Sequence, residues 1–258
     1  MSRLNRFRFT LKIYGILGLL RFTLARTFGQ SNLMRPASTV DIRSAGLDFS
    51  HDVREFVTSL LGESSNLLTE EIMLEAAEVN SMIELRAKEL EGAFPTNWNS
   101  EEQLRVALYL LVRILKPALV VETGTANGSS AAAICAGMAA NNSGVLVSVD
   151  IKDSSARLVS EKNREFLNLR KTNGTERELR EVCVAAISQW TGVKLFLHDS
   201  DHSYFGQYSD YKVATDLGFD IILSDDIDAS LAFADFAGQA GKALFDTRKI
   251  IGGMKGSI

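Results

Sequence analysis

The sequence contains little cysteine, little proline and no long apolar run. Two cysteines, Cys135 and Cys183, among 258 residues cannot make a disulfide framework or a thiolate zinc site, and they indicate a reducing compartment such as the cytoplasm. Three prolines and 19 glycines exclude a collagenous or low-complexity chain. A net charge of -4 and a pI near 5.5 argue against a generally basic nucleic-acid-binding protein. The length suits one large globular domain with an extension.

The first 40 residues lack aspartate and glutamate altogether but contain seven basic residues. Their apolar stretch, residues 13–20, is far shorter than the ~20 residues that a membrane-spanning helix needs. Residues 1–30 are therefore expected to form a basic amphipathic helix in peripheral contact with an anionic membrane or a partner. Two other interpretations stay open. One is an organellar transit peptide, and the other is a helix packed on its own domain with its basic face in solvent.

Residues 31–98 are expected to form an irregular polar connector followed by a helical cap. Apolar residues at helical spacing predict two helices in this part, over 53–61 and 69–91. Ser100 and Gln103 then have the spacing of a capping box, which predicts a further helix with Ser100 as its N-cap.

From residue 118 onward, short apolar runs alternate with helical segments. A capping box of Thr175 and Glu178 opens one of these helices. Strands that alternate with helices predict an α/β fold, a doubly wound and mostly parallel sheet with helices on both faces. In such sheets ligands bind beyond the carboxyl ends of the strands. The predicted strands are residues 118–122, 145–150, 193–199, 220–224 and 242–246.

The first strand of this series runs into a glycine-containing turn. Gly124 and Gly128 let the backbone approach a ligand closely, and the following helix offers free N–H groups at its N-terminus. The next strand ends in Asp150, whose carboxylate can accept hydrogen bonds from ribose hydroxyls. The G-x-x-x-G spacing differs from that of dinucleotide binders, which disfavours a dinucleotide oxidoreductase. A tight turn with a surface acid is the alternative.

The run ETGTANGSS, followed by VLVSVD, resembles the cofactor loop and ribose-binding acid of class I S-adenosylmethionine-dependent methyltransferases. The resemblance covers residues 99–258 and implies a Rossmann-like catalytic domain that binds S-adenosylmethionine. It departs from the family at the third strand, where residues 166–170 end in basic residues and leave the adenine contacts unassigned. The cofactor-binding residues that it implies are Glu122, Gly124, Thr125, Gly128, Ser129 and Asp150.

Three carboxylates follow two further predicted strands. Asp199 comes after one strand, and Asp225 and Asp226 come after the next, so neighbouring strand ends can bring them together. Such carboxylates repel one another unless a cation neutralises them, and oxygen ligands favour Mg²⁺, Ca²⁺ or Mn²⁺ over zinc. His202 lies three residues beyond Asp199 and can serve as a general base. The alternative is that Asp226 and Asp228 are acids that cap a helix.

The combination D-x-D-H-S-Y plus D-D resembles the metal-dependent O-methyltransferases that modify sugars and hydroxylated natural products. The resemblance implies that Asp199, Asp225 and Asp226 bind a divalent cation, with Mg²⁺ the expected one, and that His202 removes the acceptor proton. Asp201 would orient His202 or bond to nearby backbone. The acceptor implied is a hydroxyl of a sugar, a glycolipid or a secondary metabolite, and a homodimer is the default assembly.

Two other functions stay open for the same fold. One is a metal-independent methyltransferase whose acids play structural roles. The other is a non-catalytic protein that binds the cofactor and acts as a scaffold. His198 lies within an apolar strand, and we expect a hydrogen-bonded core histidine there, not a ligand.

Overall fold

The protein is described by a computed structural model over residues 45–90, 94–153, 156–246 and 249–256. The predicted basic helix over residues 1–30 lies outside these described residues. Within the described ranges, no helix combines the length and the apolarity that crossing a membrane requires.

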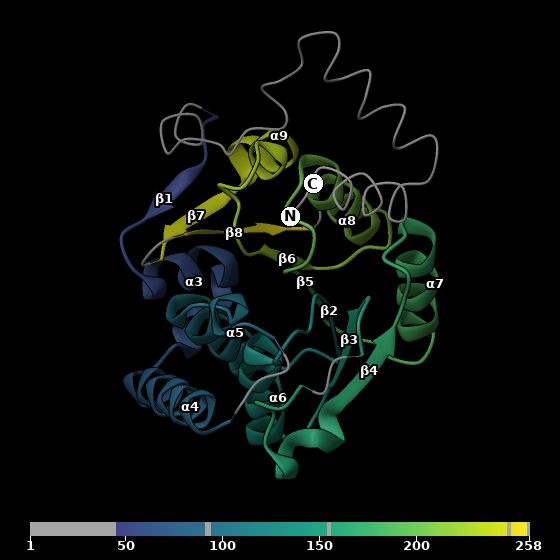
Figure 1. Ribbon diagram of the computed structural model, residues 1–258. Coiled ribbons are helices and arrows are strands. Elements are labelled where there is room, and N and C mark those ends of the chain that lie inside the picture. Colours follow the sequence, from purple (N-terminus) through teal and green to yellow (C-terminus); the bar gives the residue numbers. More distant parts are fainter. Residues whose placement is uncertain (1–44, 91–93, 154–155, 247–248, 257–258) are drawn as a thin grey trace, which may run out of the picture.

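The described residues form one eight-stranded sheet in the order β1-β7-β8-β6-β5-β2-β3-β4 (Figure 1). Neighbouring strands are parallel except for β8, which runs antiparallel to both β6 and β7. The prediction of a doubly wound, mostly parallel sheet is therefore confirmed. The strands are β1 Asp48–Ser50, β2 Leu119–Thr123, β3 Val145–Asp150, β4 Leu167–Lys171, β5 Lys194–His198, β6 Ile221–Ser224, β7 Lys242–Phe245 and β8 Ile250–Lys255.

Helices cover both faces of the sheet, each over its own hydrophobic core (Figure 1). One face carries α3 Val53–Leu61, α4 Glu70–Glu89, α5 Glu102–Leu115 and α6 Ser129–Asn141. The other carries α7 Glu176–Ile187, α8 Tyr204–Asp216 and α9 Ala232–Ala237. The short 3₁₀ helices are η2 Gly62–Leu67, η3 Thr96–Trp98, η4 Glu161–Phe166 and η5 Gly238–Ala240.

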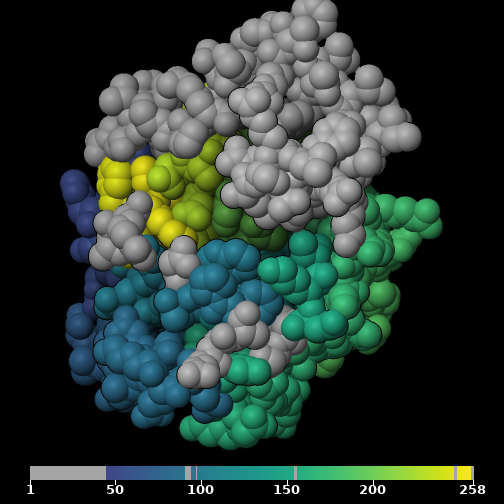
Figure 2. Space-filling view, viewed as in Figure 1, coloured from purple at the N-terminus to yellow at the C-terminus, as the bar shows by residue number. Residues whose placement is uncertain are grey.

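Strand β4 corresponds to the third-strand candidate over residues 166–170, whereas β1 and β8 escaped the sequence analysis. β1 is a three-residue strand inside the expected irregular connector, and it pairs in parallel with β7. Figure 2 shows this early segment, in purple, beside the yellow C-terminal strands. β8 was missed because Gly252 and Gly253 interrupt its apolar run. Both glycines are places of close packing, since an added Cβ would lie 2.7 Å from Phe233 of α9 or from Leu60 of α3.

The two predicted capping boxes had opposite outcomes. Thr175 caps α7 by accepting from the backbone N–H of Glu178 at 3.2 Å. The prediction for Ser100 was wrong, because Glu101 occupies the N-cap position of α5 and makes no side-chain cap bond. The Oδ2 atom of Asp246 instead accepts from the backbone N–H groups of Gln103 and Leu104, at 2.9 and 3.3 Å. A carboxylate beyond the end of β7 therefore takes the place of the local cap.

Candidate active site

The glycine turn between β2 and α6 is held in a narrow space. Gly124 and Gly128 have φ values of +89° and +82°, which favour glycine because other residues rarely adopt them. A Cβ on Gly124 would lie 1.9 Å from the carbonyl oxygen of Asp199, and one on Gly128 would lie 2.8 Å from the α-carbon of Ala156. The backbone of the turn is thus in direct contact with the carboxyl end of β5.

A buried acid in β2, directly before this turn, supports it through hydrogen bonds. Glu122 is completely buried and accepts hydrogen bonds from the hydroxyls of Ser130 and Ser148. Burial raises the pKa of Glu122 to about 7, although the two hydroxyls oppose that change. Thr125 joins the network through its hydroxyl, 2.6 Å from that of Ser148, and Ser129 donates to the carbonyl of Ser100 at 3.4 Å. These side chains hold the turn from within the fold.

Asp150 lies at the end of β3, beside the turn. Its Oδ2 atom accepts from the backbone N–H of Ala126 at 3.0 Å, and its Oδ1 atom accepts from the N–H of Lys152 at 2.9 Å. The carboxylate is partly exposed, so it still presents acceptor lone pairs at the edge of the sheet. This is the position that the resemblance assigns to a ribose-binding acid.

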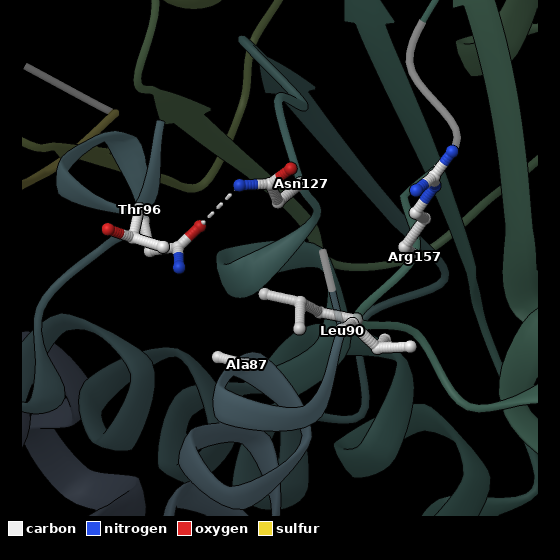
Figure 3. A pocket seen from close by; sticks show the side chains of 7 residues that line it. Ala87, Leu90, Thr96, Asn127 and Arg157 are labelled. Carbon is white, nitrogen blue, oxygen red and sulfur yellow. Dashed lines mark hydrogen bonds between the residues drawn. The ribbon is translucent and has the colours of Figure 1, made fainter. Parts of the chain in front are cut away.

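A small recess opens beside the turn, between the end of α4 and the loop after β3 (Figure 3). Asn127 extends toward this recess and donates to Asn99 at 3.0 Å and to the carbonyl of Phe94 at 3.1 Å. Asn127 therefore ties the turn to the segment before α5. The recess is lined by Ala87, Leu90, Thr96, Asn99, Asn127, Arg157 and Leu158.

The four residues expected to carry acceptor chemistry gather at the ends of β5 and β6. The strands pair with His198 opposite Ser224, so Asp199 and the Asp225–Asp226 pair emerge side by side. The Nε2 atom of His202 lies 3.8 Å from Oδ1 of Asp199 and 3.5 Å from Oδ2 of Asp226. The sequence prediction that strand ends assemble these side chains agrees with this geometry.

Burial and mutual repulsion set the charges of this cluster. Burial raises the pKa of Asp199 well above its usual value, and Asp225 and Glu122 raise it further. Burial and Asp225 likewise raise the pKa of Asp226 to about 6. Burial, His198 and Lys249 lower the pKa of His202 to about 3, so the imidazole is neutral at pH 7.

Lys249 is part of the cluster, and no sequence motif pointed to it. Its Nζ atom lies 3.2 Å from Oδ2 of Asp225 and 3.2 Å from Oδ2 of Asp226. Within the described ranges, no group of three or more histidine, cysteine, aspartate or glutamate side chains is arranged to hold a metal ion. Because the ammonium of Lys249 lies next to both Asp225 and Asp226, these two carboxylates do not fit a divalent cation. The metal site stays a prediction of the resemblance.

Behind the cluster lies a second acid–histidine pair that the sequence analysis missed. His198 is completely buried, and its Nδ1 atom lies 2.8 Å from Oδ2 of Asp210 in α8. The same oxygen accepts from the hydroxyl of Thr123 at 3.0 Å. The prediction of a hydrogen-bonded core histidine is confirmed, but Asp210 could not be chosen as its partner from spacing alone.

Other expected residues play local roles. Asp201 accepts from the backbone N–H and the hydroxyl of Ser203, both at 3.1 Å. Asp228 bonds to the N–H of Ile250 in β8 at 3.2 Å and not to a helix N-terminus, so the alternative that it caps a helix is wrong. Both cysteines are buried.

Residues 121–217 match the family model of a methyltransferase domain. The matched segment spans 97 of the 258 residues. The match includes the glycine turn, Asp150, Asp199 and His202, and it ends before Asp225 and Asp226. This match and the doubly wound sheet agree with the class I methyltransferase that the resemblance implied. Among curated protein sequences, none matches the chain significantly.

Solved structures are similar to the chain at low identity. A SAH-bound structure named cmcI is 16% identical with a TM-score of 0.36, and the alignment covers 48% of this chain and only 59% of that one. The SAH-bound methyltransferase PaMTH1 of Podospora anserina is 15% identical with a TM-score of 0.44, over 72% and 88% of the two chains. An O-methyltransferase from Bacillus cereus in complex with SAH is 17% identical with a TM-score of 0.44, over 78% and 98%.

Proposed function

We propose that this chain transfers a methyl group from S-adenosylmethionine to a hydroxyl of a sugar, a glycolipid or a secondary metabolite. One observation carries the proposal. The glycine turn touches the backbone of Asp199, so the expected donor site and the cluster that contains His202 share one edge of the sheet. A methyl transfer needs donor and acceptor side by side and in line.

The chain's own residues supply binding, orientation and proton transfer. Asp150 would accept hydrogen bonds from the ribose hydroxyls of the cofactor, because its partly exposed carboxylate lies beside the turn and bonds to the N–H of Ala126. The turn would lie against the methionine part. S-Adenosylmethionine, when bound, supplies the electrophilic methyl group. The neutral imidazole of His202 accepts the hydroxyl proton as the new oxygen–carbon bond forms. Asp226, whose Oδ2 atom lies 3.5 Å from Nε2 of His202, then stabilises the imidazolium.

The resemblance also implies a divalent cation at Asp199, Asp225 and Asp226. Lys249 lies 3.2 Å from both Asp225 and Asp226. The proposed methyl transfer therefore does not depend on a metal ion. A metal-dependent reaction is the second candidate, and it rests on the resemblance. Activity that disappears on chelation and returns with Mg²⁺ would favour it.

A membrane-proximal acceptor is a separate proposal that depends on the basic residues 1–30. Its test is sedimentation of full-length protein with vesicles that contain anionic lipid, compared with a variant that lacks residues 1–30. Equal partitioning of the two proteins would contradict it.

The function is tested by calorimetry followed by label transfer. We expect wild-type protein to bind SAH, and Asp150→Ala to weaken that binding at least tenfold. Asp153→Ala is the matched control, because its exposed carboxylate pairs with Lys171 on the surface. Methyl-labelled S-adenosylmethionine is then incubated with a panel of glycosides, phenols and lipid-linked sugars. Absence of cofactor binding would overturn the proposal, and cofactor binding without transfer to any acceptor would favour the scaffold.

A further inference from the structure

The position of Lys249 follows from the antiparallel strand at the end of the chain. β8 begins one residue after Lys249, and its register sets Gly252 opposite Ser224, the last residue of β6. Because β8 runs against β6, its first residues lie at the carboxyl end of β6, where Asp225 and Asp226 emerge. The backbone N–H of Ile227 also donates to the carbonyl of Ile250 at 2.9 Å, which fixes this end of β8 beside the acids.

Lys249 is held there as a charged group. Its Nζ atom forms ion pairs with Asp225 and Asp226, each at 3.2 Å. Its side chain is 20% exposed, and that of Asp225 is only 2% exposed. A buried carboxylate is costly unless a partner of opposite charge lies beside it. The ammonium supplies that partner for Asp225 and Asp226 together.

An ammonium and a divalent cation compete for the same oxygen atoms. Mg²⁺ requires carboxylate oxygens at about 2.0–2.1 Å in near-octahedral geometry. In this protein the Oδ2 atoms of Asp225 and Asp226 both face Nζ of Lys249 at 3.2 Å. A metal ion placed between them would lie next to a positive charge, and that repulsion opposes metal binding.

We propose that Lys249 is the resident cation of this acidic cluster and replaces the divalent metal, so that the chain transfers methyl groups without one. The role in catalysis rests on the proposed function, whereas the exclusion of metal does not. During transfer the acceptor O–H bond breaks, its proton moves to His202, and the oxygen forms a bond to the methyl carbon as the carbon–sulfur bond breaks. The ammonium of Lys249 stabilises the oxygen while it loses its proton and is itself unchanged.

The experiment measures Mn²⁺ binding by electron paramagnetic resonance, which needs neither cofactor nor acceptor. We expect wild-type protein to leave Mn²⁺ free at concentrations up to millimolar. Lys249→Met, which removes the charge, should bind Mn²⁺ at least tenfold more tightly and should gain thermal stability when Mn²⁺ is added. Adding Asp225→Asn to Lys249→Met should remove the gained binding. Lys242→Met is the control, because Lys242 pairs with Asp48 at the sheet edge, and it should behave as wild type.

Two results would overturn the proposal. One is wild-type protein that binds Mn²⁺ as tightly as Lys249→Met, and the other is Lys249→Met that folds and gains no Mn²⁺ binding. If Lys249→Met does not fold, Lys249→Arg keeps the charge and should still exclude Mn²⁺, and micromolar Mn²⁺ binding by Lys249→Arg or by wild type would again contradict it. Calorimetry with SAH on the same samples tests the methyltransferase function separately, so the two failures are distinguishable.

Discussion

The α-carbon of Gly124 faces the carbonyl oxygen of Asp199 so closely that a Cβ on Gly124 would lie 1.9 Å from that oxygen. This contact joins the two motifs of the chain, the glycine turn after β2 and the acidic segment after β5. The strands β2 and β5 are parallel neighbours, so their carboxyl ends meet at one edge of the sheet. The glycine turn and the acidic segment therefore lie at the same edge of the sheet.

Gly124→Ala is expected to lower the free energy of unfolding by about 3 kcal/mol or more, because the methyl group meets backbone that cannot move away. Binding of SAH should weaken as well. Gly218→Ala is the control, since Gly218 also has a positive φ, +69°, but nothing lies within 4 Å of its Cβ position. That variant should lose only about 1 kcal/mol. Urea denaturation of both proteins measures the difference, and equal losses would contradict the contact.

Glu122→Gln is expected to change how stability depends on pH. The pKa of Glu122 is about 7 in the folded protein and 4.5 when unperturbed. As the pH rises, Glu122 therefore keeps its proton to a higher pH in the folded protein than in the unfolded chain. The contribution of this group is fully present below pH 4.5 and is lost as the pH rises to 7, by about 3 kcal/mol in all. The variant should show a shallower decline over that window in denaturation series at pH 5, 6, 7 and 8. The exposed Glu181→Gln variant should follow wild type, and a Glu122→Gln curve parallel to wild type would refute the prediction.

His202→Asn is expected to slow methyl transfer by a factor of about 10² to 10⁴, the usual contribution of a general base. SAH binding should stay unchanged, because the turn and Asp150 are intact. Single-turnover kinetics and calorimetry separate the two effects. His51→Asn serves as the control, since His51 lies in the exposed loop before α3. Full activity in His202→Asn would remove this residue from the mechanism.

Asp246→Ala is expected to destabilise the fold by about 1–2 kcal/mol, because two N–H groups at the start of α5 lose their acceptor. Ser100→Ala should cost about 0.5 kcal/mol or less, since its hydroxyl makes only a 3.4 Å bond to Asp199. Thermal denaturation ranks the two variants. A larger loss of stability for Ser100→Ala than for Asp246→Ala would instead support the local capping box that the sequence predicts.

Much of the fold was predictable because its signals are local. Apolar runs that alternate with helices gave the parallel part of the sheet, and Thr175 with Glu178 gave the start of α7. The order of Asp199, Asp225 and Asp226 along successive strands was enough to bring them together. Each of these features depends on residues a few positions apart or on the rule that parallel strands end at one edge.

The sequence by itself therefore determined the type of fold, the glycine turn and the assembly of the acids with His202. Only the tertiary structure decided which cation faces those acids and which side chain caps α5. Lys249 reaches Asp225 across 24 positions, and Asp246 reaches Gln103 across 143. Both contacts depend on where the last two strands join the sheet. Gly252 and Gly253 let β8 pack there, but they also interrupt the apolar run from which a strand would have been predicted. No local spacing encodes such a pairing, because it is selected by packing across the whole sheet.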